Sequence, residues 1–455
     1  MAQKYLFVAE VDKIQEMLFR FSRQRQVLGG SRLLAHFCDE MEKLATKDHD
    51  AKVHTSMGGS FRISFDENHK DGIDAFEEKL ALFYRLLLDG SLTSAGYLAY
   101  DSDDAESFCK TNRALQEKLR RKKEADKGQV DVTQASIIAF CQNSGSGLAI
   151  AQGALLHREN ENNYLSKAAM DMGHAGGLGR YNQDDKKKPN AKRQALDAEE
   201  QAKEELQARK DDSEDNFLNT IREKIIDDTL KTFYWPRVID EIGRMDPLQN
   251  NVAYVLADAN GMGKLFGECE SPEELETLSQ MLDETIREAV AWPVEKLHTR
   301  MQERMDKKDV LPLLPLIVAG DDVFVLLPAC YALDYAQHFC LKFQDAMSQK
   351  IENHATLKTL QNKIKNGSLP SPSISAAVVF CKTKYPYHLA HKRGEELLRQ
   401  AKTLSKGNRD DKGRQIPSLA FEMIMGNQLV KAEDENGGPC TPTMNPYWLT
   451  YEKMG

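Results

Sequence analysis

Short apolar runs and amphipathic segments alternate along the second half of the chain. Apolar runs bounded by turn residues are typical of buried strands, and apolar residues at three- and four-residue spacing indicate helices. On this basis Leu313–Ala319 and Val323–Leu327 form a tight hairpin around Gly320-Asp321-Asp322. The other predicted strands are Asn251–Ala257, Ile374–Cys381 and Ser418–Met423, and the predicted helices are one that begins at Ser271, Pro293–Lys307, Tyr331–Glu352 and Pro386–Lys406.

The first half of the chain repeats this order of strand, helix, hairpin, helix, strand and helix. Its hairpin turn is Gly58-Gly59-Ser60 and therefore lacks the two aspartates of the second half. The same order of elements twice indicates two copies of one domain. The predicted strands are Tyr5–Glu10, Lys52–Met57, Phe61–Phe65, Ser94–Tyr100 and Thr133–Phe140, and the predicted helices are Lys13–Phe21, Ser31–Leu44, Ile73–Leu88 and Ala105–Lys122.

This order of elements predicts an α+β fold with two ferredoxin-like domains, each an antiparallel-rich sheet with helices packed on it. The first domain covers residues 1–150 and the second residues 246–430. Between them, residues 151–245 form a loop and a charged helical linker, because residues 183–215 contain almost no large apolar side chains. Residues 431–455 form a C-terminal tail.

Composition narrows the function classes. The 455 residues carry a formal net charge of −9, which argues against indiscriminate binding of nucleic acid by a basic surface. No stretch approaches the length of a transmembrane helix, and the first residues do not have the pattern of a secretory signal, so we expect a cytoplasmic protein. The eight cysteines are scattered without a Cys-x-x-Cys pair, which predicts neither a zinc knuckle nor a disulfide framework.

Three acidic residues are predicted to converge at one end of the second sheet. Asp321 and Asp322 lie at the tip of the predicted hairpin, and Asp258 ends the strand that begins the domain. Carboxylate oxygens are the ligands that Mg²⁺ prefers, and two such ions activate a hydroxyl and stabilise a leaving pyrophosphate. The alternative is an ordinary type I′ turn, in which aspartate is present because it tolerates positive φ. The sequence alone leaves both interpretations open.

Glycines follow Asp258 directly, as Gly261-Met262-Gly263. This pattern fits a tight start to a helix whose first backbone amides face a phosphate group. The same pattern is common in loops that bind nothing.

At these residues the chain resembles the polymerase-like large subunit of type III CRISPR effector complexes, whose two palm domains are related to GGDEF and adenylyl cyclase domains. In the second half the resemblance rests on Asp258-Ala-Asn-Gly-Met-Gly, on Ala319-Gly-Asp-Asp, and on Tyr385-Pro-Tyr-His before a helix that ends in Ala401-Lys402. In the first half it rests on Val11-Asp-Lys-Ile-Gln and Gly29-Gly-Ser-Arg-Leu-Leu. Asn260 and Ala319 depart from the family pattern, which has aspartate and glycine there.

The resemblance implies two palm domains, of which the second condenses ATP into short, often cyclic, oligoadenylates. Carried over by position, Asp258, Asp321 and Asp322 are catalytic and hold Mg²⁺ or Mn²⁺, with two ions expected. The nucleotide-binding residues are Asn260, Gly261, Met262, Gly263, Gly320 and Lys402, of which Lys402 neutralises the triphosphate. The first palm has Glu10 and Asp12 at a strand end but no hairpin acids, so it is predicted to bind a nucleotide or a partner without catalysis. Its Gly29-Gly30-Ser31 segment is predicted to start a helix, as an N-cap or an anion site.

The predicted function is a nucleotidyltransferase or nucleotide cyclase, similar to oligoadenylate synthases, that makes a second messenger in anti-phage defence. ATP is the favoured substrate, RNA or other defence subunits are candidate partners, and a homodimer is an open possibility. No nuclease segment or zinc module is recognisable, which favours a standalone or compact relative. The alternatives are an inactive nucleotide- or RNA-binding scaffold, a single-turnover cyclase or dinucleotide synthase, and a metal that only stabilises the fold.

Overall fold

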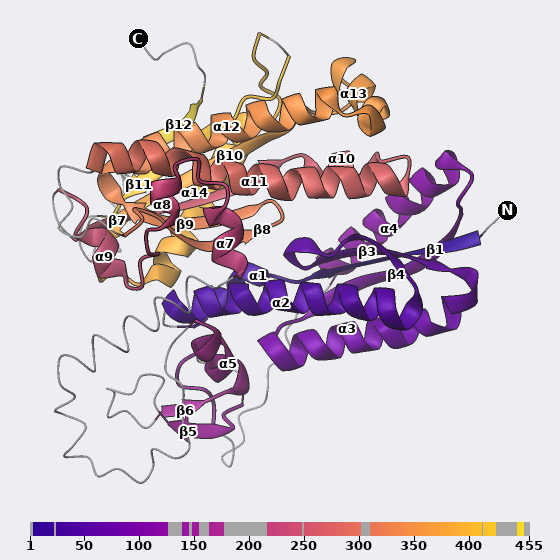
Figure 1. Ribbon diagram of the computed structural model, residues 1–455, viewed down its shortest axis with the longest axis horizontal. Coiled ribbons are helices and arrows are strands. Elements are labelled where there is room, and N and C mark those ends of the chain that lie inside the picture. The colour runs from indigo at the N-terminus through magenta and orange to yellow at the C-terminus, as the bar shows by residue number, and fades with distance from the viewer. Residues whose placement is uncertain are drawn as a thin grey trace, which may run out of the picture. The chain divides into compact units, whose positions relative to one another are not determined.

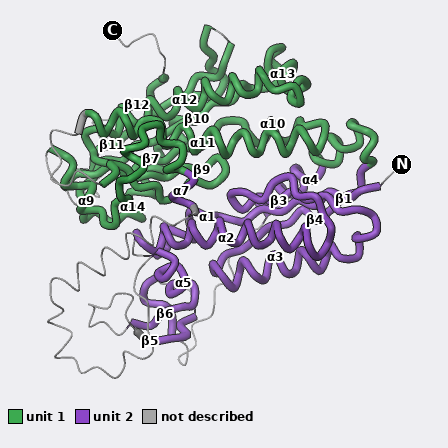
Figure 2. The backbone as a smooth tube through the Cα atoms, in the orientation of Figure 1, with its two compact units in different colours: residues 1, 101–113, 221–455 green, residues 2–100, 114–220 purple. Residues whose placement is uncertain are grey.

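The computed structural model describes residues 3–21, 24–125, 139–144, 148–153, 163–176, 216–247, 250–301, 310–411, 413–424 and 444–449. The chain divides into two compact units (Figure 2). Unit 1 contains residues 101–113 and 221–455, and unit 2 contains residues 2–100 and 114–220. The predicted linker, residues 183–215, lies outside the described residues, and so does all of the predicted tail except residues 444–449.

Unit 2 is built on an antiparallel sheet with the strand order β2-β3-β1-β4. The central strand β1 pairs with β3, and the connecting helices α1, α2 and α3 come in the order expected for a ferredoxin-like fold. Phe7, Phe65 and Phe76 meet edge to face in the core. The elements are β1 (Gln3–Val11), α1 (Ile14–Phe19), α2 (Gln24–His49), β2 (Lys52–Thr55), β3 (Ser60–Asp66), α3 (Ile73–Leu88), β4 (Leu92–Asp101), β5 (Ala151–Gly153), β6 (Asn163–Leu165) and α5 (Lys167–Ala175). The helix α4 (Ala105–Ala125) is divided between the units after Arg113.

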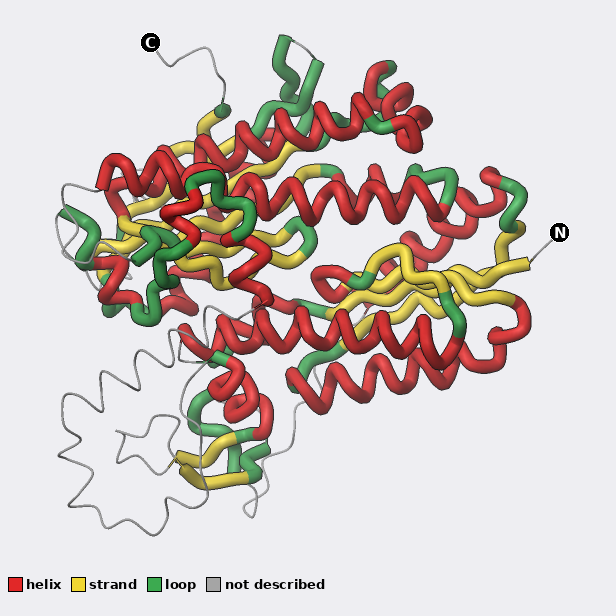
Figure 3. The backbone as a smooth tube through the Cα atoms, in the orientation of Figure 1, coloured by secondary structure: helices red, strands yellow, loops and turns green. Residues whose placement is uncertain are grey.

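Unit 1 contains a six-stranded sheet with the order β12-β11-β10-β7-β9-β8 (Figures 1 and 3). Its inner part, β10-β7-β9-β8, repeats the order of unit 2, and β11 is added parallel to β10 through the crossover helix α14. The strand β7 is buried along most of its length, as expected for a central strand. The strands are β7 (Asn251–Asn260), β8 (Leu314–Ala319), β9 (Asp322–Pro328), β10 (Ser373–Lys382), β11 (Ser418–Met423) and β12 (Met444–Trp448).

The helices of unit 1 pack on this sheet and on one another; α11 and α12 form one pair, and α14 lies against β7, β10 and β11. The α+β fold class and the ferredoxin-like order predicted from the sequence are confirmed. Among the described residues, no helix combines the length and apolarity needed to cross a membrane. The helices are α7 (Asn216–Arg222), α8 (Asp228–Lys231), α9 (Ile239–Gly243), α10 (Met262–Gly267), α11 (Pro272–Met301), α12 (Ala332–Asn353), α13 (Lys358–Lys365) and α14 (Tyr387–Ser405).

Two helix predictions were wrong. The helix expected to start at Gly29-Gly30-Ser31 begins at Gln24, so this segment lies inside α2 and is neither an N-cap nor an anion site. Glycine is needed there for close packing, because a Cβ atom on Gly29 would lie 1.9 Å from the carbonyl oxygen of Met172 in α5. The second error concerns Pro293, which was expected to start a new helix.

Pro293 instead lies inside the single long helix α11. Proline removes one backbone hydrogen bond from a helix interior, which normally favours a break or a kink. The apolar side chains on both sides of it are buried, and their packing keeps the helix continuous; they include Ala289, Val290, Ala291, Val294 and Leu297. The strand expected at Thr133–Phe140 lies almost entirely outside the described residues.

Candidate active site

The predicted hairpin is present and brings two of the acids together. The strands β8 and β9 pair through Ala319 and Asp322, which leaves a two-residue turn of Gly320 and Asp321. Asp322 therefore belongs to β9, where it lies directly opposite Asp258 of β7. Side chains at directly opposite antiparallel positions share one face of the sheet, with Cβ atoms about 4.5–5.5 Å apart.

Backbone conformation does not explain the aspartates. Gly320 has a left-handed φ of 62°, whereas neither Asp321 nor Asp322 has a positive φ. The turn is thus not of type I′, which needs positive φ at both central residues. The glycine is required by the turn, and the two aspartates are not required by it.

The helix α14 supplies a cation to this end of the sheet. Lys402 forms an ion pair with the Asp258 carboxylate, and the two side chains are 33% and 27% exposed. Burial raises the pKa of the Asp258 carboxyl, and the Lys402 ammonium acts in the opposite direction. Leu256 lies against Gly394 of the same helix, so alternation along β7 places Leu256, Asp258 and Asn260 on the face that α14 covers.

Asn260 lies at the end of β7 and is only 6% exposed. Its amide group contacts the hydroxyl groups of Ser373, Ser375 and Ser405, which are all buried. The side chain is thus surrounded by protein, so contact with a nucleotide would have to come from its backbone.

The predicted helix start after Asp258 is also present. Gly261 has a φ of 76° and precedes the short helix α10, and a Cβ atom there would lie 2.9 Å from Pro370. Met262 points into the core and is 2% exposed. Gly263 is exposed, with open space where a Cβ atom would be. The segment therefore offers backbone groups, and not the Met262 side chain, to the surface.

Whether these residues fit a divalent cation depends on how many protein ligands it needs. Within the part of the chain that the structure describes, no group of three or more His, Cys, Asp or Glu side chains is arranged to hold a metal ion. Mg²⁺ in nucleotide-handling sites commonly takes one or two carboxylates and completes its shell with water and phosphate oxygens. The opposed pair Asp258 and Asp322 fits that smaller ligand set.

Comparison with known proteins identifies this region. Residues 251–411 match the family model described as Cas10/Cmr2, second palm domain. These residues are similar to a Cas10-type second palm domain. The resemblance predicted from the sequence is thereby confirmed where the acids lie. No curated protein matches the chain significantly.

Solved structures resemble the chain in fold. A Csm1-Csm4 cassette in complex with pppApApA matches with a TM-score of 0.50 and 13% identity over 91% of this chain and 53% of that one. A cassette in complex with cA4 (TM-score 0.47, 12% identity) covers 91% and 54%, and Csm1 in T.onnurineus (TM-score 0.49, 13% identity) covers 91% and 53%. This chain thus spans about half the length of those chains.

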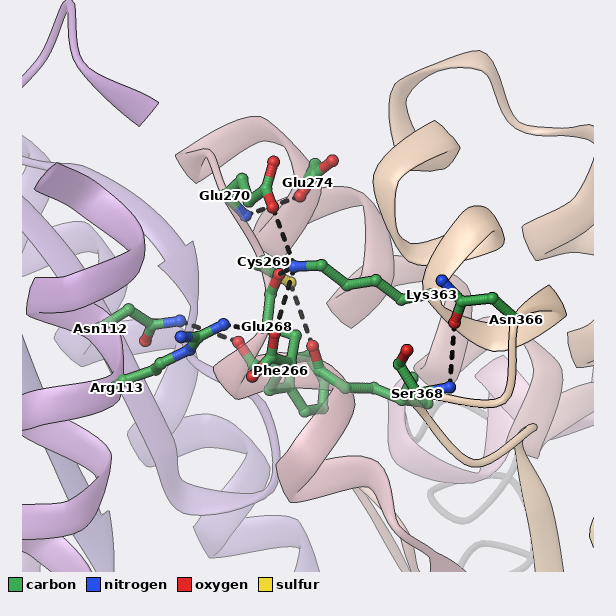
Figure 4. Close-up of polar contacts among 11 residues, drawn as sticks. Asn112, Arg113, Phe266, Glu268, Cys269, Glu270, Glu274, Lys363, Asn366 and Ser368 are labelled. Atoms are coloured by element: carbon green, nitrogen blue, oxygen red, sulfur yellow. Dashed lines mark hydrogen bonds and ion pairs between the residues drawn. The ribbon is translucent and has the colours of Figure 1, made fainter. Parts of the chain in front are cut away.

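A second charged cluster, within unit 1, was not predicted. Glu268, just after α10, accepts hydrogen bonds from Arg113 of α4 and from Lys363 of α13, and Lys363 also pairs with Glu270 (Figure 4). Burial alone would raise the pKa of Glu268, but the hydrogen bonds from Lys363 and Arg113 lower it below its ordinary value. Asn112 donates to the carbonyl oxygen of Phe266. The cluster fixes the end of α10, and no sequence signal joins residues so far apart.

Unit 2 has a related arrangement at the corresponding strand end. Glu10 of β1 lies directly opposite Ser60 of β3 and pairs with Lys123 of α4 at 2.8 Å. Arg62 lies 3.8 Å from Glu10, and Asp12 accepts a hydrogen bond from Thr93. Here the position opposite the strand-end acid is a serine, so this site lacks the second carboxylate of the palm domain.

Proposed function

We propose that the chain is a metal-dependent nucleotidyltransferase or nucleotide cyclase. It converts ATP or another nucleoside triphosphate into a cyclic or short oligonucleotide second messenger and releases pyrophosphate. The observation that carries this proposal is the direct opposition of Asp258 and Asp322 across β7 and β9, with Lys402 beside them. Two carboxylates and one ammonium at a strand end suit a metal-bound triphosphate.

Each residue has a distinct role in this proposal. Asp258 and Asp322, with Asp321 next to them in the turn, would hold Mg²⁺ or Mn²⁺, and the ion would lower the pKa of the attacking hydroxyl and offset charge on the leaving pyrophosphate. Lys402 exchanges the Asp258 carboxylate for a phosphate oxygen when the nucleotide arrives. Backbone groups at Asn260, Gly261, Met262, Gly263 and Gly320 line the nucleotide, because the Asn260 and Met262 side chains are buried.

The similar structures suggest partners. They are described as Csm1-Csm4 cassettes in complex with AMPPNP, pppApA or cA4. By analogy, this chain binds adenine nucleotides and a further subunit of a defence complex, in the cytoplasm, and RNA is a candidate activator. A homodimer is the alternative to such a subunit.

The test is pyrophosphate release from each of the four nucleoside triphosphates with Mg²⁺ or Mn²⁺, with and without RNA. We expect turnover by the wild type and its loss in the isosteric D321N/D322N variant. D71N/D74N removes the same charge from exposed residues of unit 2 and should remain active. Turnover that survives in D321N/D322N, or is lost equally in D71N/D74N, would contradict the assignment of the acids. Product size then separates a cyclase from a dinucleotide synthase or oligomer synthase.

A scaffold without turnover is the second candidate. The ion pair with Lys402 favours it, because Asp258 is already neutralised by a protein group. This candidate requires nucleotide binding, measured by calorimetry, without pyrophosphate release under any of the conditions above. If a metal only stabilises the fold, neither nucleotide binding nor pyrophosphate release would be observed. The metal would then raise the melting temperature of the wild type and not of D321N/D322N.

A further inference from the structure

A buried hydrogen-bond network surrounds Asn260. The distances from its Nδ2 to the hydroxyl oxygens of Ser373, Ser375 and Ser405 are 3.0, 2.9 and 3.4 Å. Ser375 also lies 3.3 Å from the amide oxygen of Asn260. The hydroxyl groups come from β10 and α14, so one side chain at the end of β7 is bonded to a neighbouring strand and to a helix.

Two routes lead from Asn260 to a single turn of α14. The first runs directly to Ser405, which in turn donates to the carbonyl oxygen of Ile416 at 2.5 Å. The second runs through Ser375 to Ser418, 3.1 Å away, and Ser418 donates to the carbonyl oxygen of Ala401 at 2.5 Å. The two routes end at Ala401 and Ser405, on either side of Lys402.

We propose that Asn260 is a positioning residue, which fixes the Ala401–Ser405 turn of α14 and so holds the Lys402 ammonium against Asp258. It acts through the helix and not by contact with a nucleotide. The importance of that placement for turnover rests on the proposed function, but the placement itself does not.

The chemistry of asparagine suits this role. An amide has two N–H donors, which reach the surrounding hydroxyl oxygens. Because Ser418 gives its proton to the Ala401 carbonyl oxygen, Ser375 gives its own proton to Ser418 in the second route. An aspartate at the same buried position would be an acceptor only and would add an unpaired charge, which is costly. Asparagine, which stands here in place of the family's second aspartate, is therefore the residue that fits the three surrounding serine hydroxyl groups.

The experiment measures how fast an amine-directed acetylating reagent labels Lys402, by mass spectrometry at one fixed pH, relative to Lys392. Lys392 is exposed on the same helix, so the ratio cancels differences in reagent. Neither metal nor nucleotide is present, so the result is independent of whether the chain has turnover. The Asp258→Asn variant gives the labelling ratio expected when the ion pair with Lys402 is broken.

We expect the Lys402/Lys392 ratio to rise roughly threefold to tenfold in Asn260→Ala, the change expected when a hydrogen-bonded position is released. The milder Ser405→Ala should shift it in the same direction. Ser373→Ala is the matched control, because it removes a hydroxyl group bonded to the same amide but outside both routes, and its ratio should stay at the wild-type value. Global unfolding would raise the labelling rates of Lys402 and Lys392 together.

An unchanged ratio in a folded Asn260→Ala or Ser405→Ala protein would overturn the proposal, and so would an equal rise in Ser373→Ala. If the wild type releases pyrophosphate, the positioning role also predicts that Asn260→Ala lowers kcat more than it raises KM. A raised KM with unchanged kcat would instead indicate direct nucleotide contact.

Discussion

His391 should make unit 1 sensitive to acid. This side chain of α14 is 4% exposed and packs edge to face on Phe324 of β9, with ring centroids 5.3 Å apart. Burial lowers its pKa from the ordinary value of 6.5 to about 3. The folded protein therefore keeps His391 neutral over a pH range in which the unfolded chain takes up a proton. The contribution of neutral His391 to the unfolding free energy is fully present above about pH 6.5 and is lost progressively as the pH falls towards about 3.

The size of the effect follows from the pKa difference. Each pKa unit corresponds to about 1.4 kcal/mol, so at about pH 5 the unfolding free energy should be lower by roughly 2 kcal/mol than at neutral pH, from this residue alone. His391→Leu removes the titrating group, so its loss of stability between the two pH values should be smaller by that amount. Comparing pH differences removes any packing cost of the substitution itself.

The assay is urea unfolding followed by tryptophan fluorescence. All three tryptophans, Trp235, Trp292 and Trp448, belong to unit 1, so the signal reports on this unit. His388→Leu is the control, because His388 is exposed on the same helix, and it should retain the wild-type pH dependence. Equal losses of stability in wild type and His391→Leu between neutral and acidic pH would refute the reasoning.

Three further substitutions test packing and charge. Gly29→Ala should lower the unfolding free energy of unit 2 by about 1–3 kcal/mol, because its Cβ atom would overlap the Met172 carbonyl group. Gly263→Ala has open space around the added Cβ atom and should raise the unfolding free energy by about 0.5–1 kcal/mol. Thermal unfolding of both variants measures the two changes. Lys402→Met leaves Asp258 without its cation and should cost about 1–2 kcal/mol in EDTA, less than a fully buried pair because both groups keep some solvent contact. Mg²⁺ should restore more stability to this variant than to wild type; equal gains would contradict the metal assignment.

Elements specified by local pattern were predicted well from the sequence. The hairpin of β8 and β9 follows from two apolar runs around one glycine. The strand expected at Asn251–Ala257 follows from a single apolar run, and β7 continues past it to Asn260. The errors arose where tertiary packing overrides local preference. The sequence predicted an N-cap or an anion site at Gly29-Gly30-Ser31, whereas glycine is needed at position 29 because Met172 approaches it closely. The helix predicted to begin at Pro293 is likewise part of the longer helix α11, whose buried side chains keep it continuous.

Contacts between distant residues could not be predicted from spacing. Lys402 was assigned through the family resemblance alone, and its pairing with Asp258 joins residues of α14 and β7. The role of Asn260 was inferred from its place in a motif, whereas its surroundings are set by serines in β10, α14 and β11 that no motif marks. Hydrogen bonds made by such buried polar groups depend on how strands and helices pack, which a single sequence does not specify.

The two sheets differ in chemistry at one structural position. Each begins with a strand that carries an acid near its C-terminal end, Glu10 or Asp258. In each sheet a lysine from the helix after the fourth strand, Lys123 or Lys402, pairs with that acid. The residue opposite the acid is Ser60 in the first sheet and Asp322 in the second. Two carboxylates that face each other across β7 and β9 disfavour each other's ionised form, an effect that Ser60 does not produce in the first sheet. The acid–lysine pair is thus common to both sheets, whereas an opposed pair of carboxylates is present only where the hairpin supplies an aspartate.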